Sequence, residues 1–148
     1  MKGNSSALRR GRYSETDQIY HVTFTTHNRR PLFQSLKYGR DFIQILKIES
    51  GVTDTLAFVV MPDHVHWLLQ LRNKSLSKTV QTVKSMSTRY INLVSGSTGA
   101  IWQPGFHDHA IRSDEYIVDI ARYIVMNPVR AGLVRSVREY PHWDAVWV

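Results

Sequence analysis

Two histidines in the middle of the chain have the residue type and the spacing of a metal site. His64 and His66 are separated by Val65, and in a strand the pleat would place both imidazoles on one face, about 6.5–7 Å apart at Cα. Two neutral imidazoles on a stiff element can share a divalent metal ion. Strand histidines also serve as packing or hydrogen-bonding residues, so the pair alone leaves both interpretations open.

A second histidine pair, His107 and His109, has the same spacing later in the chain. The neighbours of the first pair are apolar and suit a buried strand, whereas Gly105 and Asp108 flank the second pair. We therefore expect the first pair to be the more rigid site. The sequence assigns no role to the second pair.

Tyr123 and Asn127 can complete such a site from a helix near the C-terminus. They are four residues apart, so in a helix the amide lies one turn beyond the phenol on the same side. Tyr116 would lie two turns before Tyr123 on nearly the same face, and nearness to Asn127 favours Tyr123. Packing residues are the alternative interpretation for both tyrosines.

Together these residues fit phosphodiester chemistry. A divalent ion held by two imidazoles and an amide oxygen keeps open positions, where a phosphate oxygen can bind and be polarised. A phenol has a reference pKa of about 10, so as a nucleophile it needs a metal or base to remove its proton. Its attack would leave a phosphotyrosine link and a free hydroxyl on the departing strand, which conserves the bond energy for rejoining. A weaker alternative is a metal-dependent hydrolase in which Tyr123 only orients water.

Composition narrows the class of protein. The 148 residues, 43% of them hydrophobic, suit a single domain over residues 1–148. The absence of cysteine excludes disulfides, thiolate zinc sites and cysteine nucleophiles. No apolar run approaches the roughly 18–20 residues of a membrane span, and we expect a cytoplasmic protein. Nineteen Lys and Arg against twelve Asp and Glu give a net charge of +7, which favours polyanionic partners such as nucleic acid.

Hydrophobic periodicity predicts alternating strands and helices. Strands are expected over residues 19–26, 55–60, 64–71 and 106–111, and helices over 32–48, 75–94 and about 113–127. Ser113 is the predicted cap of the last helix, and Pro128 disfavours its continuation. The first six elements have the order of the split βαβ arrangement. This predicts an α+β, ferredoxin-like fold with a four-stranded antiparallel sheet, both helices on one face, and an additional C-terminal helix that carries Tyr123.

Four separated stretches resemble the REP-associated tyrosine transposases, which are single-tyrosine HUH endonucleases and transposases. Residues 59–71 contain the HUH motif, two histidines around a hydrophobic residue, and residues 123–134 are similar to the signature of this family around its tyrosine. Residues 102–112 are similar to the segment before the tyrosine helix, and residues 29–33 to the usual opening. The agreement runs through most of the chain in the same order.

The resemblance implies metal-dependent cleavage and rejoining of single-stranded DNA next to a hairpin such as a palindromic repeat. Residue by residue, it makes His64 and His66 the ligands of Mg²⁺ or Mn²⁺ and Tyr123 the nucleophile. Asn127 matches the third polar ligand, a position where related transposases often carry Gln. His109 matches a recurring family histidine of unassigned task, and His107 matches no family role. Family members differ in whether one chain or a dimer completes the site, so monomer and homodimer both remain open.

Basic and aromatic residues are the predicted DNA contacts. Phosphates would be bound by a basic N-terminal arm over residues 1–15, with Arg9, Arg10 and Arg12, and by Arg29 and Arg30. Unpaired bases would stack on Trp102 or Phe106. The arm also fits a solvated tail, and a non-catalytic module that binds hairpin DNA or RNA is the alternative for the whole protein.

Overall fold

The computed structural model describes residues 17–49 and 53–147. Arg9, Arg10 and Arg12 of the predicted basic arm lie outside the described residues. Among the helices of the described part, none is both long and apolar enough to cross a membrane.

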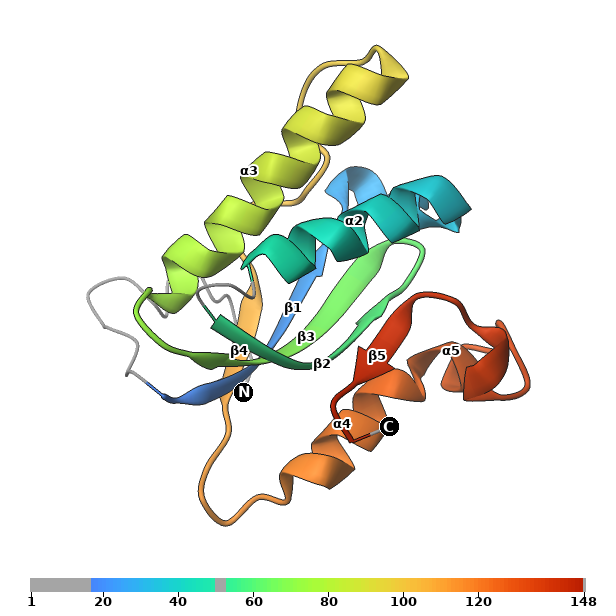
Figure 1. Ribbon diagram of the computed structural model, residues 1–148. Helices are drawn as coiled ribbons and strands as arrows, with labels where there is room; N and C mark the ends of the chain where they lie inside the picture. Colours follow the sequence, from blue (N-terminus) through green and yellow to red (C-terminus); the bar gives the residue numbers. More distant parts are fainter. Residues whose placement is uncertain (1–16, 50–52, 148) are drawn as a thin grey trace.

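An antiparallel sheet forms the centre of the molecule, with the strand order β4-β1-β3-β2-β5 (Figure 1). The strands are β1 (Ile19–Thr25), β2 (Thr53–Val60), β3 (His64–Leu71), β4 (His107–Ala110) and β5 (Trp143–Ala145). The α+β fold and the first four strands are as predicted, but the sheet has five strands rather than four. The fifth strand was missed because its three residues are too short for an alternating pattern, and it adds to the edge of β2.

The helices lie on both sides of this sheet (Figure 1). On one side are α2 (Leu36–Glu49) and α3 (Leu76–Ser95), which pack on each other, and on the other side is α4 (Ile117–Val125), followed by α5 (Asn127–Arg130). Short 3₁₀ turns occupy His27–Arg29, Leu32–Gln34 and Val137–Glu139. The Ser75 side chain caps α3 by accepting a hydrogen bond from the Lys78 N–H.

Each face of the sheet has its own apolar core. Alternate residues of β3, among them Val65, Trp67 and Leu69, are buried with α2 and α3, whereas Leu68 is buried in a second cluster with Ile124 of α4. Because side chains alternate along a strand, His64 and His66 belong to the face of Leu68. The histidine pair therefore lies on the side of the sheet that α4 covers.

The last helix begins and ends differently from the prediction. It begins at Ile117, with Tyr116 at the cap position and no side-chain cap, so Ser113 is not its cap. It ends at Val125, two residues before the predicted end, and the Met126 N–H still donates to the Arg122 carbonyl. The short α5 follows, where Pro128 stands in the first turn and its missing N–H needs no partner.

Candidate active site

His64 and His66 lie next to each other at the start of β3. Their ring centroids are 5.1 Å apart and the ring planes are steeply inclined. Across the sheet their partners on β1 are Thr25 and Thr23. The predicted common face of the two imidazoles is thus present in the fold.

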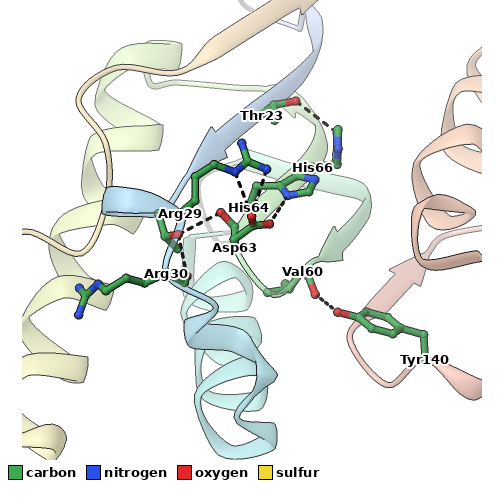
Figure 2. A network of polar contacts seen from close by, with 9 residues as sticks. Thr23, Arg29, Arg30, Val60, Asp63, His64, His66 and Tyr140 are labelled. Carbon is green, nitrogen blue, oxygen red and sulfur yellow. Dashed lines mark hydrogen bonds and ion pairs between the residues drawn. The ribbon is translucent and has the colours of Figure 1, made fainter. Parts of the chain in front are cut away.

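The His64 ring is held by the residue before it. Its Nδ1 lies 2.8 Å from Asp63 Oδ1, and the other carboxylate oxygen accepts a hydrogen bond from Arg29 Nε at 3.1 Å. Figure 2 shows the Asp63 carboxylate between the His64 ring and the Arg29 side chain. Burial alone would raise the pKa of Asp63, but the hydrogen bond to His64 and the nearby charges of His64 and Arg29 lower it. Asp63 therefore remains an anion that accepts from both neighbours.

The turn that carries Asp63 is fixed from the end of β1. The fully buried Thr26 donates from its backbone N–H to the Asp63 carbonyl at 2.9 Å. Its hydroxyl lies 2.8 Å from the Arg30 carbonyl and 3.2 Å from the Asp63 carbonyl, between these two acceptors. The Phe33 N–H donates to the Pro62 carbonyl at 3.0 Å. These bonds fix the entry into β3 and, with it, the position of His64.

The His66 ring has its partners on β1. Its Nδ1 lies 3.0 Å from His21 Nε2 and 3.2 Å from Thr23 Oγ1. Burial lowers the pKa of His66 to about 3, with further lowering from His21, His64 and Arg130. Burial, followed by the charge of His109, lowers the pKa of His21 to about 4. Both rings are therefore neutral near pH 7, the state in which an imidazole binds a metal.

The two histidines have the arrangement expected of metal ligands. In each, Nδ1 has a protein partner, and within the described part of the chain neither Nε2 makes a hydrogen bond. A ligating histidine usually uses one nitrogen for the metal and the other for such a partner. No group of three His, Asp or Glu side chains among the described residues could hold a metal ion. A metal at this pair would need a third ligand of another kind, such as an amide or a substrate oxygen.

Tyr123 lies on α4 with 59% of its side chain exposed. The Arg130 guanidinium covers its ring, 3.7 Å from the centroid, and donates from Nη2 to the Tyr123 carbonyl at 2.6 Å. The charge of Arg130 also acts on His66. Arg130 thus contacts Tyr123 directly and is near enough to His66 for its charge to act there. Tyr116, the other candidate, is 68% exposed at the start of α4.

Asn127 opens α5 and is half-buried. Its Nδ2 donates to the Ile124 carbonyl at 3.1 Å. This bond uses the amide nitrogen and leaves Oδ1 as the atom that can coordinate a cation. Because α4 and α5 are separate helices, the Tyr123–Asn127 spacing is set by the break at Met126 rather than by one continuous helix.

His107 and His109 lie on the same face of the sheet, on the far side of β1. Their cross-strand partners are Thr23 and His21, respectively. His109 Nε2 is 3.0 Å from a carboxylate oxygen of Glu115, in the loop before α4. The second pair therefore lies on the same face of the sheet as the first, with His21 between them on β1. His21 and Asp63 were not among the predicted site residues, although the alternation of β1 places His21 on this face.

The predicted DNA contacts divide into two groups. Arg29 and Arg30 are exposed, beside the turn that carries Asp63. Trp102 and Phe106 are only 5% and 7% exposed, and Trp102 packs against Phe33 and donates from Nε1 to Ser87 Oγ at 2.9 Å. This burial leaves little of either ring for stacking with a base, although Phe106 lines a hollow at the surface. Both are core residues in this fold.

A hollow of about 350 Å³ lies beside the histidine pair. Its polar lining includes Thr23, Thr25, Gln103 and His107. Thr23 and Thr25 are the cross-strand partners of His66 and His64, so the hollow and the pair are neighbours on the sheet. Phe24, Pro104 and Phe106 form the apolar part of its lining.

The chain can now be placed in a family of transposases. The family model described as "Transposase IS200 like" matches residues 14–127, and the chain belongs to this family.

The most informative relatives are REP-associated tyrosine transposases. The chain is 29% identical to the one from Escherichia coli K12 over 133 residues, 88% of this chain and 78% of the relative. It is 30% identical to a relative from Haemophilus influenzae over 100 residues, 60% of this chain and 57% of that protein.

Two solved structures have the same fold. A REP-associated tyrosine transposase bound to a REP hairpin is 26% identical, with a TM-score of 0.76 over 89% of this chain and 79% of the other. A protein from Deinococcus radiodurans R1 is 22% identical, with a TM-score of 0.53 over 84% of this chain and 95% of the other, and its similarity concerns the fold alone.

Proposed function

We propose that this protein is a metal-dependent DNA transposase that cleaves and rejoins single-stranded DNA next to hairpins, through a covalent link to Tyr123. The observation that carries the proposal is the histidine pair, with both Nδ1 atoms held and both Nε2 atoms without a hydrogen-bond partner in the described residues, on the sheet face covered by the tyrosine helix. Membership of the transposase family agrees with this chemistry.

The proposed reaction is one transesterification that can run in both directions. The Tyr123 Oη loses its proton and bonds to a phosphorus of the DNA backbone. The bond from that phosphorus to the departing strand breaks, and the released oxygen takes a proton and becomes a hydroxyl. Attack of a hydroxyl on the phosphotyrosine reverses these steps and rejoins a strand.

His64, His66 and the Asn127 Oδ1 would hold a Mg²⁺ or Mn²⁺ ion. Bound there, the ion would supply Lewis-acid polarisation of the phosphate. Asp63 and His21 fix the rings of the two histidines. The Arg130 guanidinium covers the Tyr123 ring, 3.7 Å from its centroid, and so holds the side chain in place.

Hairpin DNA is the proposed partner. The related structure with a REP hairpin supports this choice, as do the net charge of +7 and the exposed Arg29 and Arg30 beside the site. The hollow beside the histidine pair would take an unpaired nucleotide of the flank.

An adduct assay tests the nucleophile. The protein is incubated with Mg²⁺ or Mn²⁺ and hairpin DNA that carries a single-stranded flank of randomised sequence, and the products are separated under denaturing conditions. We expect a protein–DNA adduct that Tyr123→Phe abolishes, that EDTA prevents and that the control Tyr116→Phe retains. An adduct with Tyr123→Phe would show that the nucleophile is assigned wrongly, with Tyr116 next to be tried.

The same assay separates the alternative functions. Tight, salt-sensitive hairpin binding without any cleavage would indicate a non-catalytic binding module. Cleaved DNA without a covalent adduct would indicate a hydrolase in which Tyr123 orients water.

A further inference from the structure

The nitrogen that His66 offers to a metal depends on which nitrogen carries its proton. A neutral imidazole has one N–H and one lone pair, and a metal can bind only at the nitrogen with the lone pair. For His66 to use Nε2, its Nδ1 must be protonated and must donate a hydrogen bond. The partner of Nδ1 therefore decides whether His66 can act as a ligand.

His21 is placed to be that partner. Its Nε2 lies 3.0 Å from His66 Nδ1, the two ring centroids are 5.2 Å apart, and His21 and His66 come from neighbouring strands. A neutral His21 that keeps its own proton on Nδ1 presents a lone pair at Nε2. The opposite pair of tautomers would place the proton of His66 on Nε2 and block metal binding.

We propose that His21 is a positioning residue, which accepts the hydrogen bond from His66 Nδ1–H and so keeps His66 Nε2 unprotonated and available to the metal. The inference rests on the proposed metal-binding role of His66. His21 itself touches neither metal nor DNA in this assignment.

His21 has a second histidine on its other side. His109 is its cross-strand partner on β4, and Glu115 accepts a hydrogen bond from His109 Nε2. His21 therefore lies between His109 and His66 on this face of the sheet.

Thr23 is the competing partner, since its hydroxyl lies 3.2 Å from the same Nδ1. The two possibilities are separated by replacing each partner with a residue of similar shape. His21→Phe keeps a ring on β1 and removes the acceptor, His21→Gln restores an amide oxygen as acceptor, and Thr23→Val removes only the hydroxyl.

The first measurement is the tautomer of His66 in the metal-free protein, from long-range ¹H–¹⁵N NMR correlations of the imidazole nitrogens. We expect the Nδ1–H form in the wild type and in Thr23→Val, and a shift toward Nε2–H in His21→Phe. A wild-type His66 in the Nε2–H form, or no change in His21→Phe, would overturn the proposal.

The second measurement is Mn²⁺ affinity by calorimetry. His21→Phe should weaken binding by about 10–100-fold, the usual effect of losing the partner of a metal-bound histidine, and His21→Gln should recover most of it. Thermal unfolding of each variant checks that the fold is intact. If the wild type binds no Mn²⁺, the proposed metal function fails, whereas the tautomer measurement still decides the role of His21. A loss in Thr23→Val and not in His21→Phe would assign the role to Thr23.

Discussion

At the scale of single residues, the Asp63 carboxylate connects a proposed metal ligand, His64, with a proposed DNA contact, Arg29. One oxygen is bonded to His64 Nδ1 and the other to Arg29. Arg29 has a positive φ of 52°, as does its neighbour Asn28 at 56°, a conformation that residues other than glycine rarely adopt. The chain thus accepts an unfavourable backbone conformation at the place where Arg29 reaches Asp63.

Asp63→Asn should weaken Mn²⁺ binding by about tenfold, because the amide is a poorer acceptor for the His64 N–H and no longer carries a charge. Calorimetric titration with Mn²⁺ measures the effect. Asp144→Asn, on the exposed side of β5, is the matched control. Equal affinities for the wild type and Asp63→Asn would show that His64 does not depend on this carboxylate.

Sequence reasoning at this scale found the residues that share one element and missed those that meet across elements. His64 and His66 are two apart on one strand, so strand geometry alone gives their common face. The meeting of His21 with His66 depends on the register between β1 and β3, which no local pattern specifies. The burial of Trp102 was likewise hidden, because an aromatic residue beside Pro104 and Gly105 resembles an exposed loop residue.

At the scale of elements, the segment before β5 fixes the end of β2. The Val60 N–H donates to the His142 carbonyl at 2.9 Å, and the buried Tyr140 hydroxyl donates to the Val60 carbonyl at 2.6 Å. Figure 2 shows Tyr140 reaching the strand end that leads to Asp63 and His64. Burial raises the pKa of Tyr140 to about 12, so this hydroxyl remains a donor. The segment before β5 therefore supports the turn that carries the candidate site.

Gly39→Ala should destabilise the protein by about 1–3 kcal/mol, as overpacking does in a filled core. A Cβ on Gly39 of α2 would overlap the imidazole ring of His142, which is buried and would have to shift. Urea unfolding measures the cost. In a His142→Ala background the same substitution should cost little, and an unchanged cost there would place the strain elsewhere.

At the scale of the whole molecule, buried neutral histidines make stability depend on pH. Burial, followed by the charge of Arg40, lowers the pKa of His142, and burial also lowers those of His21 and His66. An unfolded histidine has a pKa of about 6.5. Between that value and the lowered folded values the unfolded chain binds more protons, so protonation favours unfolding.

The free energy of unfolding should be highest above about pH 6.5 and should fall as the pH decreases toward 4, the direction expected for lowered folded pKa values. His142→Asn should reduce this slope, because one of the titrating groups is removed. Urea unfolding between pH 4 and pH 8 gives the slopes. A variant as pH-sensitive as the wild type would show that His142 protonates equally in both states.

The order of elements was the most predictable property of the whole molecule. The strands β1, β2 and β3 and the helices α2 and α3 have long periodic patterns, and with the short β4 their order is that of the ferredoxin-like arrangement. The end of the chain was less predictable because β5 and α5 are only three and four residues long. Such short elements are decided by what they pack on rather than by their own sequence.

The alternation of β3 has a consequence for insertions and deletions. Odd-numbered residues from Val65 to Leu71 are buried with α2 and α3, while the even-numbered His64 and His66 face the candidate site. Loss of one residue at the start of β3 would reverse this parity and direct the imidazoles into the apolar core. Insertions or deletions in β3 should therefore keep the imidazoles on their face only when they change the length by an even number of residues. The neighbouring β2 differs, because its pairing with β3 already contains a register shift between Thr55 and Ala57.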